Sequence, residues 1–585
     1  MNTPEITKTP CAAPAAPKFP EQVTGMYILA QALKRIGLDT VYGLVGIPVT
    51  EAAYAMQLCD VRYVGFRFEQ QAGMAAATHG YLTRKPGVLL TVSSLGFLNG
   101  LTATANATVN CYPMIQISGA SDPKMVDMNM GTYEQLDQFN TAKPLVKAAF
   151  RCSSAKDIPS AVARAYRAAV SGRPGGIYID MTTPALAEVM DAAEAEKLFY
   201  QPVDLYSPVA PNQAAVNRAV DLLVNANRPA ILLGKGAAYA QVDDKIKTLI
   251  ETYNIPYLPM SMAKGLMPDN GPLSALSCRS DIMSKSDVVM VIGARLNWML
   301  SFGRGKWNPA MKFIQLDVEP QEIDVNVPIA APVVGDMGLS LDAILAGLKG
   351  KTMQADPAWL AGLQAETKAK NAKFAARLKN VKSPMDHWTA LGAIKPIIES
   401  NPDIILVNEG ANTLDDTRDS IDMTLPRHRV DCATWAIMGM GMGSCVGAAV
   451  ATGKQVVAIE GDSAFGFSGM DFATISRFKL PVTVVIFNNG GIYNNVGENP
   501  SKDPAIEHDP APTTLDLEAR YEKIAETFGA DGYYVTTPAE LSDALTKSIA
   551  ARRPAIINVQ LAADAGKESG HIGYLNPTPL IQYKV

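Results

Sequence analysis

Glu460-Gly461-Asp462-Ser463 follows the apolar run Val456–Ile459, and Asn488–Tyr493 follows a second apolar run, Val482–Phe487, with twenty-four residues between the two polar stretches. Short apolar runs rich in Val and Ile predict buried strands of a parallel sheet. The carboxyl ends of parallel strands meet at one edge of an open α/β sheet, where such sheets bind ligands. The sequence therefore predicts an α/β fold with a ligand site formed by these two polar stretches.

The same alternation of apolar runs and helical patterns occurs three times and predicts three tandem α/β domains with mainly parallel sheets. We expect helices near residues 25–37, 69–82 and 97–108, and an exposed helix with a connector over 350–385. The expected boundaries are 1–20 for a flexible tail, 21–195, 205–350 and 385–570 for the three domains, and 571–585 for a C-terminal tail. The expected strands are Val41–Val45, Arg62–Phe66, Val88–Val92, Met114–Ile117, Ile177–Asp180, Ala230–Leu233, Val288–Ile292, Phe313–Leu316, Ile404–Val407, Val456–Ile459, Val482–Phe487 and Ala555–Val559.

Composition excludes several classes of protein. The 585 residues are 48% hydrophobic and 19% charged, which excludes disorder for most of the chain. The net charge of −5 disfavours a nucleic-acid partner, and no apolar run approaches the roughly 20 residues that span a membrane. Seven scattered cysteines without a CxxC pair, and an N-terminus without the apolar stretch of a signal peptide, favour a cytoplasmic protein without a disulfide framework.

The two polar stretches offer three oxygen donors: a carboxylate at Asp462, an amide oxygen at Asn489 and a backbone carbonyl near Gly491. Hard oxygen ligands with room for water and phosphate suit Mg²⁺ bridging to a diphosphate, and glycines allow the backbone to approach phosphates closely. Gly-Asp-Ser alone is common, but its pairing with Asn-Asn at this spacing resembles the fingerprint of thiamine-diphosphate (ThDP) enzymes. The resemblance implies that Asp462, Asn489 and the Gly491 carbonyl bind Mg²⁺. It also implies cofactor contacts by the neighbouring residues Ser463, Ile492 and Tyr493.

Such a cofactor needs a second element, because ThDP acts through a carbanion formed when its own aminopyrimidine takes a proton. A carboxylic acid must hydrogen-bond the pyrimidine to favour this. Glu69 follows the expected strand near Arg62–Phe66 and begins a helix rich in small residues. The resemblance implies that Glu69 is this acid, whereas the residues alone also fit a glutamate that only stabilises a helix N-terminus. In the superfamily the glutamate of one chain meets the ThDP of another, so the resemblance implies a homodimer or a homotetramer.

Within this superfamily the chain is most similar to oxalyl-CoA decarboxylases, over about Gly25 to Asn576. The resemblance implies ThDP- and Mg²⁺-dependent, non-oxidative decarboxylation of oxalyl-CoA, a small-molecule CoA thioester, to formyl-CoA and CO₂. The stretches that carry the resemblance are Tyr42–Thr50, Gly96–Leu101, Gly131–Glu134, Leu233–Tyr239, Ile292–Trp298, Asn408–Asn412, Gly461–Met470 and Glu568–Ile572.

The family's site residues carry over position by position. The polar groups around the reacting carbon would be Tyr133, Glu134, Tyr493 and Ser569. The further cofactor contacts would be Ile47, Ala436 and Met438, of which Met438 would wedge under the bent cofactor. Without the resemblance, the Tyr133-Glu134 pair fits a solvated turn and Met438 fits core packing.

Binding of a CoA thioester requires cations for its phosphates. Arg279 and Arg418 are the candidates, because a guanidinium forks onto phosphate, although each alone also fits an ordinary surface arginine. The family's middle domain can bind ADP as an activator, and Arg173, Arg295 and Asp317 match that pattern. An adenine-nucleotide site with a purely structural role fits the same residues.

Four positions depart from the decarboxylase pattern and bear on substrate and rate. Leu95 replaces a usual proline, and Ala436 replaces a usual glycine beside the aminopyrimidine, where a β-carbon would crowd it. Asp386 stands in place of an asparagine that contacts CoA, and His571 stands in place of an arginine found in some members.

Three rival functions follow from the same residues. A 2-hydroxyacyl-CoA lyase or an acetolactate-synthase-like carboligase shares the ThDP residues, and Tyr133-Glu134 and Ser569 weigh against it. Leu95 and Ala436 motivate a catalytically silent CoA- or nucleotide-binding protein. A flavin or nicotinamide oxidoreductase ranks last, because no GxGxxG follows a strand of the middle domain.

Overall fold

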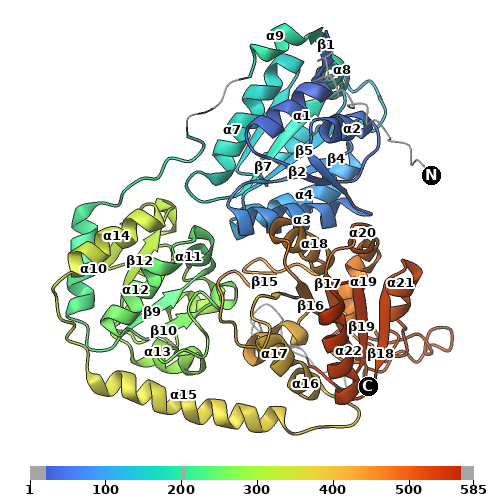
Figure 1. The fold of residues 1–585 in the computed structure, drawn as a ribbon. Coiled ribbons are helices and arrows are strands. Elements are labelled where there is room, and N and C mark those ends of the chain that lie inside the picture. The colour runs from blue at the N-terminus through green and yellow to red at the C-terminus, as the bar shows by residue number, and fades with distance from the viewer. Residues whose placement is uncertain (1–20, 200–201, 203, 568–585) are drawn as a thin grey trace, which may run out of the picture.

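The computed structural model describes residues 21–199, 202 and 204–567 (Figure 1). The expected tails at 1–20 and 571–585 lie outside the described residues, as do Ser569 and His571. Three parallel sheets flanked by helices follow one another along the chain, so the predicted α/β class is confirmed.

The first sheet has six parallel strands in the order β3-β2-β4-β5-β7-β6. One face packs on α1 and α7 through side chains such as Val41, Val88 and Ile115, and the other packs on α3 and α4 through Tyr42 and Leu89. Its strands are β2 (Thr40–Gly43), β3 (Arg62–Gly65), β4 (Gly87–Thr91), β5 (Met114–Ala120), β6 (Ala148–Cys152) and β7 (Gly176–Thr182). Its main helices are α1 (Gly25–Arg35), α2 (Thr50–Leu58), α3 (Glu69–Thr83), α4 (Leu95–Asn110) and α7 (Ile158–Val170).

The second sheet has five parallel strands in the order β10-β9-β11-β12-β13. One face packs on α10, α12 and α14, and the other packs on α13 and the first turns of α15. Its strands are β9 (Pro229–Leu233), β10 (Tyr257–Pro259), β11 (Val288–Ile292), β12 (Lys312–Asp317) and β13 (Ala331–Val334). Its helices are α10 (Gln213–Val224), α11 (Lys235–Ala240), α12 (Asp243–Tyr253), α13 (Arg279–Lys285) and α14 (Met337–Leu348). The expected exposed helix over 350–385 is α15 (Pro357–Leu378).

The third sheet has six parallel strands in the order β15-β14-β16-β17-β19-β18. One face packs on α18 and the other on α16 and α22. Its strands are β14 (Ile405–Asn408), β15 (Arg429–Asp431), β16 (Val456–Gly461), β17 (Val482–Asn488), β18 (Asp531–Val535) and β19 (Ala555–Gln560). Its helices are α16 (His387–Glu399), α17 (Asn412–Ser420), α18 (Gly441–Thr452), α19 (Asp462–Ser468), α20 (Phe472–Arg477), α21 (Glu522–Thr527) and α22 (Pro538–Ala551).

Smaller elements complete the fold. A two-stranded antiparallel pair joins β1 (Gln22–Thr24) to β8 (Val189–Asp191). The remaining α-helices are α5 (Pro123–Asp127), α6 (Gln138–Ala142), α8 (Thr183–Ala187) and α9 (Ala192–Glu196). In the described part of the chain, no helix combines the length and the apolar character needed to cross a membrane.

Helices α3 and α18 pack against each other and join the first sheet to the third (Figure 1). The approach is close because Gly443 and Gly447 of α18 face α3: a β-carbon added to either would lie 2.4 Å from a backbone oxygen, that of Gln71 or that of Ala75. Gln71 fixes the register, since its Oε1 accepts from Gly443 N at 3.0 Å and its Nε2 donates to Gly439 O. The start of α3, where Glu69 lies, is thereby held against the third sheet.

Candidate active site

Asp462 lies where β16 ends and α19 begins, at the edge predicted to bind a ligand. Its Oδ1 accepts from Ser463 N at 2.7 Å, and its Oδ2 accepts from Gly490 N at 2.8 Å and Gly491 N at 3.2 Å. These bonds join the ends of the adjacent parallel strands β16 and β17, so the two polar stretches do meet. Burial raises the pKa of Asp462 to about 6, although the three backbone N–H groups favour its ionised form.

Asn489 follows β17 and is almost fully buried. Its Nδ2 donates to Tyr493 O at 2.9 Å and to Ala565 O. Both amide hydrogens are therefore used, whereas Oδ1 accepts no hydrogen bond from the described residues. The side chain thus offers one free oxygen, which is the group that a hard cation binds.

Glycines keep this edge of the third sheet open. Gly410, which follows β14, has φ +109°, and Gly490 has φ +70° with Leu517 Cα only 2.5 Å from the position of an added β-carbon. Strands β14, β16 and β17 are neighbours, so the turns that follow them lie side by side at the carboxyl edge of the sheet, the place of the predicted ligand crevice. A carboxylate, an amide oxygen and a carbonyl at such an edge fit Mg²⁺ with a diphosphate, so the residues present suit this cofactor group.

Two buried acids lie behind this crevice, and sequence reasoning missed both. The carboxylate of Glu409 accepts two backbone hydrogen bonds: Oε1 accepts from Gly439 N, and Oε2 accepts from Gly441 N at 2.6 Å. Glu460 has no hydrogen-bond partner for either oxygen within the described ranges. Burial raises the pKa of both carboxyl groups, and the neighbouring Glu409 raises that of Glu460 further. Each carboxyl group therefore holds its proton more strongly than an exposed glutamate does.

Glu69 is the first residue of α3 and is 6% exposed. Its Oε2 accepts from Asn99 Nδ2 of α4 at 3.1 Å. No other hydrogen bond to this carboxyl group is formed by the described residues. Glu69 is thus a nearly buried acid with one oxygen engaged, as expected for an acid that meets a ligand group.

Among the described residues of one chain, Glu69 is not bonded directly to Asp462 or Asn489, although the segments that carry them are in contact. Arg67 N donates to Asp471 Oδ1 at 2.8 Å, which places the segment before Glu69 against the third sheet. Burial raises the pKa of Asp471 to about 6, and the charge of Glu69 contributes. Across the described residues, however, no hydrogen bond or ion pair joins Glu69 to Asp462 or Asn489.

The Tyr133-Glu134 pair lies in a loop beside the start of α4. Tyr133 is 66% exposed, while Glu134 Oε2 accepts from Ser93 Oγ at 2.6 Å. Ser94 Oγ donates to Glu134 O, and Ser94 has the strained backbone angles φ 47° and ψ −96°. Leu95, the departure from the family's proline, begins α4 and is largely exposed. Glu134 therefore has a specific partner, which a free surface turn would lack.

The other cofactor candidates differ in burial. Met438 is half-buried and does not belong to the buried core, and Ala436 is exposed. Tyr493 has φ +69°, and its carbonyl accepts the bond that orients Asn489. Ile47 is 68% exposed and Ile492 is 37% exposed. Lys567, the last described residue, donates its N–H to Asn412 Oδ1 at 3.2 Å.

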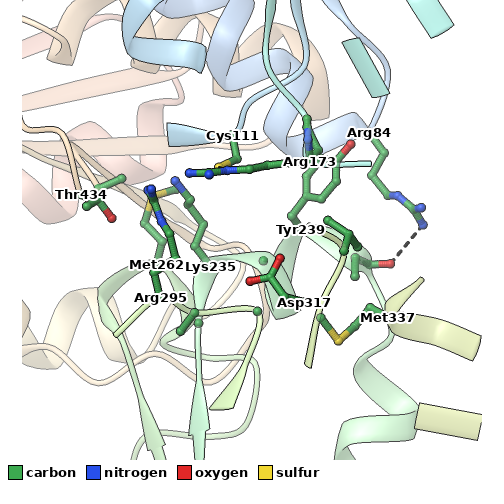
Figure 2. A pocket seen from close by; sticks show the side chains of 18 of the residues that line it. Arg84, Cys111, Arg173, Lys235, Tyr239, Met262, Arg295, Asp317, Met337 and Thr434 are labelled. Carbon is green, nitrogen blue, oxygen red and sulfur yellow. Dashed lines mark hydrogen bonds between the residues drawn. The ribbon is translucent and has the colours of Figure 1, made fainter. Parts of the chain in front are cut away.

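A cavity of about 420 Å³ lies between the first and second sheets. Arg173, Arg295 and Asp317 all line it, so the structure brings these three predicted residues together (Figure 2). Arg173 Nε donates to Cys111 Sγ at 2.9 Å and its Nη1 pairs with Glu322, while Arg295 Nη2 donates to Val109 O at 3.0 Å. Burial raises the pKa of Asp317 to about 6.

Lys235 is a further cation of this cavity, which Arg84 and Lys85 also line, and it was not predicted. Its Nζ donates to Asn110 O and lies 4.4 Å from the ring centroid of Tyr112. Burial lowers the pKa of Lys235 to about 8. The signal that points to it is its position directly after Gly234 at the carboxyl end of β9, where α/β sheets bind ligands.

Arg279 and Arg418 lie near each other between the second and third sheets. Burial and the nearby Arg418 lower the pKa of Arg279. Arg418 Nη2 donates to Asp415 Oδ1 at 2.7 Å, and Arg279 Nη2 donates to Met299 O.

Asp386 caps α16 by accepting from Thr389 N at 2.8 Å and pairs with Lys382 Nζ at 2.8 Å, so its charge is locally balanced.

Family models of the thiamine pyrophosphate enzymes match three stretches of the chain. The N-terminal TPP binding domain matches residues 23–141, the central domain matches 216–344 and the C-terminal TPP binding domain matches 415–559. The chain is 51% identical over 557 residues to oxalyl-CoA decarboxylase of Escherichia coli K12, covering 95% of this chain and 98% of the relative. It is 39% identical to 2-hydroxyacyl-CoA lyase of Arabidopsis thaliana (95% and 99% covered) and 35% identical to 2-hydroxyacyl-CoA lyase 1 of Homo sapiens (96% and 98% covered).

Proposed function

Because the chain belongs to the thiamine pyrophosphate enzyme family, together with oxalyl-CoA decarboxylases, we propose that it is a carboxy-lyase that converts oxalyl-CoA to formyl-CoA and CO₂ with ThDP and Mg²⁺. The single observation that carries the proposal is 51% identity to oxalyl-CoA decarboxylase over nearly the whole of both chains. Two features of the site support the proposal. The edge of the third sheet offers the oxygens of Asp462, Asn489 and the Gly491 carbonyl, and Glu69 is a nearly buried acid.

Asp462, Asn489 and the Gly491 carbonyl would hold Mg²⁺, and Ser463, Ile492 and Tyr493 would border the diphosphate. When bound, ThDP supplies a nucleophilic carbon and an electron sink for the departing CO₂. Glu69 would hold the proton that the aminopyrimidine shares with the protein, with Ile47, Ala436 and Met438 against the rings. In this arrangement residues 21–195 carry the pyrimidine side and residues 385–570 the diphosphate side.

The substrate side of the mechanism rests on the loop near α4. Glu134, held by Ser93 at Oε2, and the exposed Tyr133 would hydrogen-bond the oxalyl group. Tyr493 would meet the same group from the third sheet, and Ser569, which lies outside the described residues, would add a hydroxyl. Exchange of the carboxylate for hydrogen consumes one proton, which a hydroxyl or carboxyl of this set would deliver to the reacting carbon.

Arg279 and Arg418 would bind the CoA phosphates. Burial and the neighbouring Arg418 lower the pKa of Arg279, and an anion between the two guanidinium groups would offset their mutual repulsion. The cavity of Arg173, Arg295 and Asp317 would bind ADP, with the arginines on the phosphates and Asp317 on a ribose hydroxyl. Titration calorimetry with ADP and with Arg173→Ala tests this second site.

The active unit would be a homodimer or homotetramer, in which Glu69 of one chain completes the crevice of another. The resemblance to ThDP enzymes, in which the glutamate of one chain meets the cofactor of another, supports this. Exposed apolar side chains around both halves support it too: Ile47, Leu95, Phe467 and Met470 are each more than 60% exposed.

Incubation with ThDP, Mg²⁺ and oxalyl-CoA, followed by mass spectrometry, tests the reaction. Formyl-CoA and CO₂ are the expected products, and Glu69→Gln should remove nearly all of them. A second tube with formyl-CoA and an aldehyde tests the alternative, a 2-hydroxyacyl-CoA lyase, which the 39% and 35% identical relatives favour. Product in the second tube alone would replace the proposal with the lyase. A protein that binds ThDP yet makes neither product would be the catalytically silent form that Leu95 and Ala436 suggest.

A further inference from the structure

We propose that Asn99 is a positioning residue for Glu69: it holds Oε2 of the carboxyl group, so that Oε1 is the oxygen presented to the cofactor. The inference rests on the proposed function of Glu69. It assigns a role to the Gly96-Phe97-Leu98-Asn99 stretch, which none of the activities discussed above explains.

The contacts come from one face of α4. Asn99 Nδ2 donates to Glu69 Oε2 at 3.1 Å. Gly96, three residues earlier and therefore one turn away on the same face, lies beside the other oxygen: a β-carbon there would be 3.0 Å from Oε1. The helix thus places a donor on Oε2, whereas beside Oε1 it places only Gly96, which has no side chain. Oε1 has no hydrogen-bond partner in the described part of the chain.

The chemistry of the amide explains why the two oxygens differ. An Asn Nδ2 group only donates, so Oε2 must accept from it. A proton that Glu69 shares with a ligand therefore lies on Oε1. The donated bond also holds the side chain in one rotamer, and a fixed geometry of reacting groups is a large part of enzymatic rate enhancement.

Helix α4 is itself fixed at both ends, so Asn99 has a defined position. At its start, Ser94 N donates to Gln138 Oε1 at 2.5 Å, in the strained conformation that only a supporting structure maintains. At its end, Asn110 Oδ1 accepts from Thr434 N at 3.1 Å and Trp435 N at 3.0 Å. Asn99 is therefore carried by a helix anchored to the loop of Glu134 and to the segment that leads to Met438.

Asn99→Leu tests the proposal, because leucine has a similar volume but cannot donate. The first readout is exchange of the C2 proton of bound ThDP with deuterium, followed by acid quench and NMR. We expect this exchange to slow by about tenfold, the scale of one hydrogen bond to an ionised group. The second readout is calorimetry of ThDP with Mg²⁺, in which we expect affinity to change less than about threefold. In turnover, kcat should fall while KM for the CoA thioester is kept.

Controls separate this inference from the proposed function. Thr102→Val, on the exposed side of α4, should leave exchange, affinity and turnover unchanged. An exchange rate in Asn99→Leu equal to that of the wild type would overturn the proposal. A slower exchange that is matched by an equal loss of ThDP affinity would overturn it too. Should Asn99→Leu fail to fold, Asn99→Ala is measured against the same criteria. Normal exchange in Glu69→Gln would instead refute the assigned role of Glu69.

Discussion

A pair of complementary variants tests where the active site lies. Glu69 is carried by the first sheet and Asp462 by the third, and in the described residues no contact joins them within one chain. If the site forms between chains, a heterodimer of Glu69→Gln and Asp462→Ala has one site with both lesions and one with neither. We therefore expect about half of the wild-type kcat per dimer, whereas each homodimer should retain below about 1%, because removal of one essential group leaves little activity.

The assay requires heterodimers of defined composition. The two chains are produced together with different affinity tags, purified over both tags in sequence, and assayed for formyl-CoA. The reciprocal heterodimer, wild type with a chain that carries both substitutions, is the matched control. It breaks both sites if they form between chains and leaves one intact if they form within chains. Activity in the reciprocal heterodimer and none in the complementary one would refute the reasoning.

Four other substitutions test three further predictions. In Gly441→Ala, the added β-carbon would lie 1.9 Å from Glu460 Oε1, so the free energy of unfolding should fall by about 1–3 kcal/mol in denaturant titrations. Gly362→Ala lies in the exposed helix α15, where no atom is within 4 Å of the added carbon. This variant should instead raise the free energy of unfolding by up to about 1 kcal/mol. Equal changes in the free energy of unfolding for the two glycine variants would contradict this prediction. Because burial lowers the pKa of Lys235 to about 8, ADP affinity measured by calorimetry should fall as pH rises through about 8, and Lys235→Met should remove that dependence. Arg418→Gln should raise KM for the CoA thioester several-fold at unchanged kcat, and a fall in kcat alone would exclude a binding role.

The sequence was sufficient to predict the interior strands of the fold. Runs such as Val288–Ile292 and Val482–Asn488 are buried on both faces and therefore read as continuous apolar segments. The strands that were not predicted lie at sheet edges or are short. Strand β6 has four half-buried residues, and β18 begins with Asp531 and Gly532, so neither carries the same apolar signal.

The same distinction applies to the candidate site. Asp462 and Asn489 could be predicted because each lies within three residues of the end of an apolar run, so whether they meet depends only on the order of the strands. The buried pair Glu409 and Glu460 could not, because no local pattern shows that two acids fifty-one residues apart end beneath the same glycine, Gly441. The position of a residue that is held only by long-range contacts can be read from the structure but not from the local sequence.

Helix α4 connects the two regions that the sequence analysis treated separately. Its first turns place Asn99 on Glu69, and its last residues, Val109 and Asn110, accept hydrogen bonds from Arg295 and Lys235 in the cavity between the first and second sheets. An anion that enters this cavity must compete with these backbone carbonyls for the same cations. The cavity and the site around Glu69 therefore lie at opposite ends of one helix, although none of their side chains is common to both.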